Sequence, residues 1–252
     1  MTAAVVLALL GLALGPALGV IVDRAVERER LKPLQRCTSC RSDLGSVSLV
    51  PLVSWFRRCA GCGGHPGWRY PVIDLSAAVA LALVGATLGL RAATIGYAAF
   101  ALVLVVLSVI DLETHLLPNV ITYPAFLGGL VLVVVGAACY GSPERILSAL
   151  VGGASAFVLL FLLHVIRPAG MGMGDVKLAP TLGLALGWLY GNAWLAVSLV
   201  LYALLVASLG GGLIGLAVNV VRRRREEIPF GPALAAGTLA ILALSPVLVV
   251  TT

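Results

Sequence analysis

Two aspartates stand where long apolar runs end, and their chemistry makes them the first candidates for function. Asp111 follows the apolar run 92–110, and Asp175 lies in the segment Gly-Met-Gly-Met-Gly-Asp-Val-Lys at 170–177. A carboxylate at a membrane boundary is costly, so its presence usually reflects a function. Two carboxylates at a similar depth can activate a water molecule by acid–base chemistry. Asp111 and Asp175 are therefore the candidate catalytic residues.

The residues that follow Asp111 indicate a turn. Pro118 and Asn119 favour a helix break before the next apolar run. Glu113 and His115 are titratable groups close to Asp111 in the sequence, and we interpret both as solvated loop residues.

The segment before Asp175 is rich in glycine. Gly172 and Gly174 would let the backbone adopt unusual dihedral angles or approach a substrate closely. Such an irregular segment is tolerated at membrane depth where it lines a cavity. Lys177 lies two residues after Asp175, so the two side chains would not face each other on a helix. Lys177 could reach the membrane interface or set the electric field near the aspartates.

Four cysteines predict a metal site in the most polar part of the chain. Cys37 and Cys40 form one Cys-x-x-Cys pair, Cys59 and Cys62 form a second, and 18 residues separate the pairs. This spacing is a strong zinc signal, and four thiolates leave no open coordination position, which favours a structural role. His65 could replace one ligand, although we favour a solvated histidine.

The composition places the chain in the membrane class. The 252 residues are 60% hydrophobic and 11% charged, with a mean hydropathy of +1.08. Soluble domains carry about 25% charged residues, whereas a membrane span needs about 20 consecutive apolar residues. We predict an all-α polytopic membrane protein of about eight transmembrane helices. The candidate spans are 3–22, 72–90, 92–110, 120–140, 146–166, 175–191, 193–221 and 229–250.

The first of these runs could also be a signal peptide. No basic residue precedes it and no Ala-x-Ala cleavage site follows it, so we favour a helix. Its Gly11, Gly15 and Gly19 have the spacing of a close helix contact, and we interpret the glycine pairs and triplets at 152–153 and 210–212 in the same way. Cys139 is interpreted as a small packed hydrophobic residue, and His164 as a hydrogen-bonded packing residue.

The positions of the basic residues predict the orientation. Nine of the 17 lysines and arginines lie in the loop 23–71, and four more form the run 222–225. With eight spans, 15 of the 17 fall on one face, which the positive-inside rule assigns to the cytoplasm. Both aspartates are then at cytoplasmic helix ends, in a plasma or inner membrane. This topology explains the net charge of +6, so no nucleic-acid partner is needed.

Four motifs, in order, resemble those of the type IV prepilin peptidases, which are membrane aspartic proteases of the Gly-x-Gly-Asp class. The first is the cysteine pairs with the flanking segments 51–58 and 69–71, and the second is Asp111 followed by Leu117-Pro118-Asn119. The third is 170–177 with its lysine, and the fourth is 228–237. The resemblance implies three segments: a first helix (1–22), a cytoplasmic zinc loop (23–71) and a peptidase domain (72–252).

The resemblance also implies an activity. Such enzymes remove the basic leader peptide of prepilins and pseudopilins, and they need no metal for proteolysis. Many then methylate the new N-terminus with S-adenosylmethionine, an activity linked to the zinc loop. Family members usually carry Ser-Phe-Leu-Asn-Val and Arg-x-Pro near the end of the first helix. This chain has Gly15-Pro16-Ala17-Leu18-Gly19-Val20 and then Arg24-Ala25-Val26, so a peptidase without methyltransferase activity is an alternative.

Two other classes of function compete with the peptidase. In an ion- or proton-coupled transporter the carboxylates would line a path through the bilayer, yet most acids here lie at one face. A membrane scaffold would explain the cysteines but not the paired aspartates. Within the peptidase hypothesis, the negative end of a helix dipole at Asp111 and the positive end at Asp175 predict that Asp111 starts protonated and Asp175 ionised.

Overall fold

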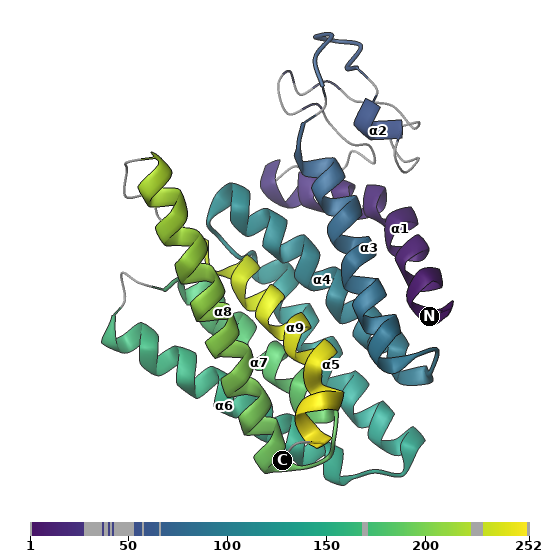
Figure 1. Cartoon of the computed structure of the whole chain (residues 1–252), viewed down its shortest axis with the longest axis vertical. Helices are drawn as coiled ribbons and strands as arrows, with labels where there is room; N and C mark the ends of the chain where they lie inside the picture. Colours follow the sequence, from purple (N-terminus) through teal and green to yellow (C-terminus); the bar gives the residue numbers. More distant parts are fainter. Residues whose placement is uncertain are drawn as a thin grey trace.

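The chain forms a bundle of helices (Figure 1). The described residues between 37 and 68, called the loop region below, lie at one end of it. In this computed structural model the described residues are 2–27, 37, 40, 42, 53–56, 58–65, 67–167, 171–222 and 229–250. Every regular element within these ranges is a helix. The helices are α1 (Thr2–Glu27), α2 (Val53–Phe56), α3 (Arg69–Leu88), α4 (Ala92–Thr114), α5 (Asn119–Tyr140), α6 (Glu144–Ile166), α7 (Met173–Trp188), α8 (Ala193–Arg222) and α9 (Gly231–Val250).

The eight apolar runs of the sequence each form one helix, and the prediction of an all-α membrane protein is confirmed. Six helices are long and apolar enough to cross a membrane: α1, α3, α4, α5, α6 and α8. The apolar part of α9 is shorter, and α7 has only 16 residues. The short α2, which the sequence did not indicate, lies in the loop region between α1 and α3.

Glycines set the closest helix contacts, as their spacing predicts. A Cβ on Gly11 would lie 2.5 Å from the Ala77 carbonyl oxygen, so α1 and α3 touch backbone to backbone. A Cβ on Gly152 of α6 would lie 2.4 Å from the carbonyl oxygen of Gly183 in α7. The prediction is wrong for Gly210 and Gly212, because α8 turns these two positions toward open space.

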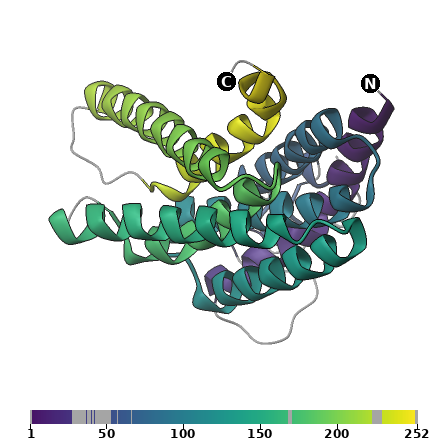
Figure 2. The ribbon, with the colours of Figure 1, turned by 90° about the horizontal axis from the view of Figure 1, so that it is seen from below.

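The short α7 is the inner helix of the bundle. Its residues are mostly buried, and it contacts α5, α6, α8 and α9. Figure 2, seen from the end opposite the loop region, shows α8 and α9 side by side, in agreement with their contacts. A helix surrounded by other helices can be shorter than the bilayer is thick, because its ends contact protein instead of lipid.

Helix α5 is the most loosely packed of the long helices, with 17% of its most apolar window buried. Cys139 lies on this helix and is exposed, so the expectation of a packed cysteine is wrong. The physical reason is that little of the α5 surface meets another helix.

Short connections make successive helices antiparallel, which brings particular helix ends together. The C-terminal end of α4 and the N-terminal ends of α3, α5 and α7 lie at the end of the bundle that carries the loop region (Figure 1). Gly170, Arg223 to Arg225 and most basic residues of the 23–71 loop lie outside the described residues.

Candidate active site and metal centre

Asp111 is buried in the last turn of α4. The backbone N–H of Gly231, the first residue of α9, donates a hydrogen bond to Asp111 Oδ2 at 2.9 Å. A residue 120 positions later in the chain thus fixes the position of this carboxyl group. A Cβ on Gly231 would lie 2.6 Å from the same oxygen. His115 ends α4 in the left-handed conformation with φ of 53° and is exposed, as expected.

Asp175 is buried in the first turn of α7. Its N–H donates a hydrogen bond to the Gly172 carbonyl oxygen at 3.2 Å. A Cβ on Gly172 would lie 3.6 Å from Asp175 Oδ2, so the Gly172 backbone borders the carboxyl group. A Cβ on Gly174 would lie 3.0 Å from Leu117 Cβ. Because these two glycines have no side chains, the backbone before α7 can lie against the Asp175 carboxyl group, and the first turn of α7 can pack against Leu117 in the α4–α5 turn.

The fold brings the two aspartates together. They come from different helices, each is 5% exposed, and their charges are close enough to interact. Two neighbouring buried carboxyl groups can share one proton, because like charges that lie close together disfavour the doubly ionised state. Such a pair offers one acid and one base at the same place.

The other predicted supporting residues, Pro118, Asn119 and Lys177, lie at the starts of α5 and α7. Pro118 precedes α5 with an extended backbone, and its carbonyl oxygen accepts hydrogen bonds from the N–H groups of Ile121 and Thr122. Lys177 donates a hydrogen bond to Asn119 Oδ1 at 3.1 Å, and its Nζ lies 5.8 Å from the centre of the Tyr123 ring. Lys177 thus joins the first turns of α5 and α7.

Glu113 belongs to a buried ionic network, which corrects its interpretation as a solvated residue. Arg69, at the start of α3, pairs with Glu113 Oε1 at 3.1 Å and with Asp23 Oδ1 of α1 at 2.5 Å. The Tyr70 hydroxyl donates to the second Asp23 oxygen at 2.9 Å. Side-chain exposures of 10% for Arg69 and 15% for Glu113 exclude most water. The sequence misses this pairing because the partners come from three separate helices.

A second buried acid connects the loop to the helices. Trp55 of α2 donates its indole N–H to Asp74 Oδ2 of α3 at 2.8 Å, and Asp74 is 1% exposed. A Cβ on Gly15 of α1 would lie 2.7 Å from Asp74 Cα. No local pattern in the sequence indicated Asp74 or Trp55 as a partner of the other.

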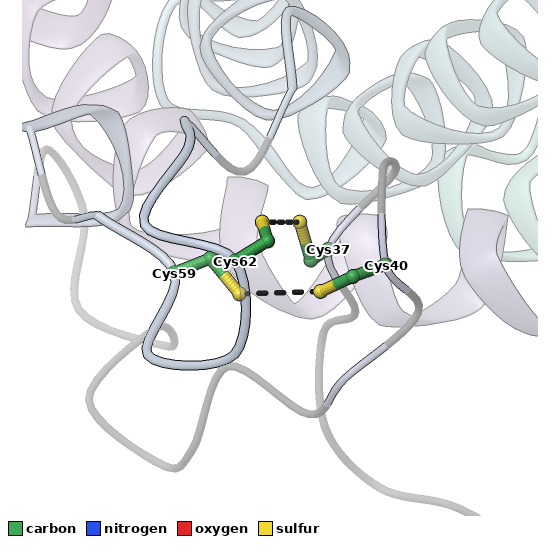
Figure 3. Close-up of side chains that lie close together, drawn as sticks. All are labelled: Cys37, Cys40, Cys59 and Cys62. Carbon is green, nitrogen blue, oxygen red and sulfur yellow. Dashed lines mark hydrogen bonds between the residues drawn. The ribbon is translucent and has the colours of Figure 1, made fainter.

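The four predicted cysteines form one cluster (Figure 3). Cys37 and Cys62 have their sulfurs 3.7 Å apart, those of Cys40 and Cys59 are 3.5 Å apart, and all four lie within 4.8 Å of one another. Each sequence pair therefore contributes one sulfur to each close contact. The two segments also share a backbone feature: Cys37 N–H donates to Ser42 O, and Cys59 N–H donates to Gly64 O.

This cluster fits zinc by distance and by donor type. Sulfurs bound at about 2.3 Å around a tetrahedral ion lie about 3.8 Å apart. Hydrogen bonds from the Ser42 hydroxyl, 3.0 Å from Cys59 Sγ, and from the backbone of Cys62 and Gly61 lower the pKa of the Cys59 thiol to about 6, which favours the thiolate that binds metal. The exposed His65 is not part of the cluster. His164, as expected, hydrogen-bonds through Nδ1, to the Met171 carbonyl oxygen at 2.9 Å.

Sequence comparisons agree with the order of these features. Residues 98–216 match the type IV leader peptidase family, and residues 9–88 match the bacterial peptidase A24 N-terminal domain. A prepilin leader peptidase/N-methyltransferase of Aeromonas salmonicida is 33% identical over 221 residues, which are 83% of this chain and 71% of that protein. One of Bacillus subtilis is 29% identical over 217 residues, 83% and 81% of the two chains. No solved structure matches the chain.

Proposed function

The chain belongs to the type IV leader peptidase family, and we propose that it is a membrane aspartic endopeptidase that removes the basic leader peptide of prepilins or pseudopilins. The observation that supports the mechanism is that Asp111 and Asp175, from different helices, are both buried and that the charge of Asp111 reaches Asp175. The hydrogen bond from Lys177 to Asn119 joins the first turns of α7 and α5.

The proposed reaction uses the single proton that the pair retains. The ionised carboxylate accepts a proton from water while the water oxygen attacks the scissile carbonyl carbon. The protonated carboxyl donates a hydrogen bond to the carbonyl oxygen. When the carbon–nitrogen bond breaks, the leaving amine takes the proton that the other carboxylate had accepted from the water, so the pair again holds one proton. Two coupled carboxyl groups are sufficient for these proton transfers, so the proposal includes no metal in proteolysis.

The division of roles within the pair has opposing contributions. The position of Asp111 at a helix C-terminus favours its protonated form, and the position of Asp175 at a helix N-terminus favours its ionised form. The Gly231 amide opposes this assignment, because a donor to Asp111 Oδ2 favours an ionised Asp111. Infrared spectra of the two single Asn variants would decide between them. If the pKa of Asp111 in the Asp175→Asn variant is lower than the pKa of Asp175 in the Asp111→Asn variant, the assignment predicted from the helix ends is reversed.

The basic loops support an active site that faces the cytoplasm, in an inner or plasma membrane. In this arrangement residues 1–22 anchor the zinc loop 23–71, and residues 72–252 form the peptidase domain. The partners are a prepilin or pseudopilin substrate and the lipid bilayer.

Zinc would be held by Cys37, Cys40, Cys59 and Cys62 and would stabilise the loop, since four thiolates leave no position for a substrate. The relatives are named for methyl transfer as well as proteolysis. Transfer of a methyl group from S-adenosylmethionine to the new N-terminus is therefore the second proposed activity, and a peptidase without it is the alternative.

Co-expression with a prepilin, followed by mass spectrometry of the product, tests both activities. Cleavage by the wild-type chain and its near-complete loss in Asp111→Asn and Asp175→Asn are expected. The double variant should be no slower than either single variant, because the pair acts as a unit. Substantial cleavage by a correctly inserted single variant would refute the dyad. A cleaved product without an added methyl group, with donor present, would leave a peptidase alone.

A further inference from the structure

His164 is the one ionisable residue in the second half of α6. The residues from 157 to 166 are otherwise apolar, and the neighbours Leu163 and Val165 are exposed, whereas His164 is half-buried. An ionisable side chain in a membrane-spanning helix is costly and usually has a specific partner and a function. Neither the proposed catalytic step nor the zinc cluster uses this histidine.

The partner of His164 is the Met171 carbonyl oxygen, 2.9 Å from Nδ1. A carbonyl oxygen can only accept, so Nδ1 carries a proton and donates the hydrogen bond. The neutral ring with its proton on Nδ1 and the doubly protonated ring both have this donor. The bond therefore joins the last turn of α6 to the segment before α7 in either charge state of the ring.

This bond holds the segment that borders the Asp175 carboxyl group. Met171 directly precedes Gly172, whose backbone is extended and whose carbonyl oxygen accepts the Asp175 N–H at 3.2 Å. A Cβ on Gly172 would lie 3.6 Å from Asp175 Oδ2, so a shift of Gly172 changes the surroundings of that carboxyl group. Two hydrogen bonds thus bracket Gly172, one at Met171 and one from Asp175.

The bond also continues the packing of α6 against α7. Gly152 of α6 meets the backbone of Gly183 of α7, and the two helices are antiparallel. Twelve residues after Gly152 the chain reaches His164, and twelve residues before Gly183 lies Met171. The pair therefore keeps the register of the glycine contact up to the segment before α7. The glycines of that segment allow many backbone conformations, and a hydrogen bond to Met171 removes part of this freedom.

We propose that His164 is a positioning residue for Asp175. Its Nδ1–H fixes the Met171 carbonyl group and so keeps the Gly172 backbone against the Asp175 carboxyl group. The proposal rests on the proposed endopeptidase function, and it assigns no proton transfer to His164. Loss of the bond lets the segment move and misplaces a reacting group, which slows the chemical step more than it weakens substrate binding.

Steady-state cleavage of a prepilin is the first test. His164→Ala should lower kcat about tenfold and change KM by less than about twofold. His164→Asn, whose side-chain amide can donate in place of Nδ1, should restore kcat to within about threefold of wild type. Ser155→Ala is the matched control on α6, because the Ser155 hydroxyl donates to the carbonyl oxygen of Gly152 in the same helix, and it should leave kcat unchanged.

Two kinetic results would overturn the role of His164. One is a wild-type kcat in His164→Ala. The other is a His164→Asn variant as slow as His164→Ala, because asparagine keeps a donor but cannot take up a proton, so the imidazole itself would then be required.

Hydrogen exchange tests the same bond without substrate. The amides of residues 171–176, which include the Asp175 N–H, should exchange at least about threefold faster in His164→Ala than in wild type, and His164→Asn should restore their protection. Ser155→Ala should match the wild type. Unchanged exchange in His164→Ala would refute the proposal even if cleavage were slower. Failure of the wild-type chain to cleave any prepilin would instead refute the endopeptidase function, and the exchange rates would still show whether His164 holds the segment.

Discussion

At the residue scale, backbone groups of glycines define much of the immediate environment of the two aspartates. The Gly231 amide holds Asp111, and the Gly172 backbone borders Asp175. Lys177, the basic residue nearest to Asp175 in sequence, binds Asn119 instead. Fixed backbone dipoles can stabilise charge as it develops without the reorganisation that mobile side chains require.

Gly231→Ala should slow cleavage by about 100-fold, because a displacement of about 1 Å at a reacting group has an effect of that order. The new Cβ would meet Asp111 Oδ2 at 2.6 Å, and the carboxylate would have to move. Steady-state kinetics should show the loss mainly in kcat. Gly212→Ala, at an open position of α8, is the matched control. A kcat within twofold of wild type for Gly231→Ala would contradict this role for Gly231.

The cysteine cluster makes a separate prediction about metal content. The purified chain should contain one zinc ion, and Cys37→Ser or Cys59→Ser should strip or weaken it, since both thiols are buried in the cluster. Cys139→Ser, on α5, should keep the metal. Elemental analysis measures this directly. A strong chelator should leave proteolysis intact. Wild-type protein that is isolated without zinc and is fully active would contradict the assignment of the four thiols as ligands of a structural zinc ion.

At the element scale, Arg69 connects three helices beside the active site. It joins α3 to Asp23 of α1 and to Glu113 of α4, and Glu113 lies in the same last turn as Asp111. The loop region follows α1 and precedes α3, and its Trp55 binds Asp74 of α3. Two contacts in the first two turns of α3 therefore position different parts of the protein: Asp74 positions the loop region through Trp55, and Arg69 positions the end of α4 through Glu113.

Arg69→Met should destabilise the protein by about 3–5 kcal/mol, because it leaves two buried carboxylates without their cation. The unfolding midpoint in a fixed detergent should fall, and adding Glu113→Gln should restore part of the loss. The exposed Arg167→Met is the control. An unchanged midpoint in Arg69→Met would show that Asp23 and Glu113 do not depend on this pairing.

At the scale of the whole molecule, successive helices alternate in direction and give the bundle two distinct ends. The loop region, both aspartates and the Arg69 network lie at one end, while the N and C labels in Figure 1 lie away from that loop region. The segregation of basic residues predicts that the end with the aspartates faces the cytoplasm.

Reporter fusions test this orientation. An alkaline phosphatase fused to the C-terminus should be active outside the cytoplasm, and the same reporter inserted in the connection between α8 and α9 should be inactive. The arginine run of that connection should hold it inside. Replacing all four arginines by glutamine should weaken the preference. The opposite reporter pattern in the wild-type chain would invert the proposed topology.

The sequence by itself determined the class of the molecule and most of its elements. Runs of apolar residues must form helices in a bilayer, because only internal hydrogen bonds can satisfy their backbone there. For this reason all eight predicted runs are helices. The two Cys-x-x-Cys pairs also predicted their own cluster, since their spacing and thiol chemistry specify tetrahedral binding.

Only the tertiary structure decided which residues meet across helices. Glu113 was expected in solvent, yet Arg69 from α3 and the covering helices bury it. Cys139 was expected in a core, yet α5 packs too loosely to cover it. The contact of Gly231 with Asp111 and that of His164 with the Met171 carbonyl group are equally invisible in the sequence. Periodicity and composition specify one helix at a time, whereas these features depend on how several helices are rotated and spaced against one another.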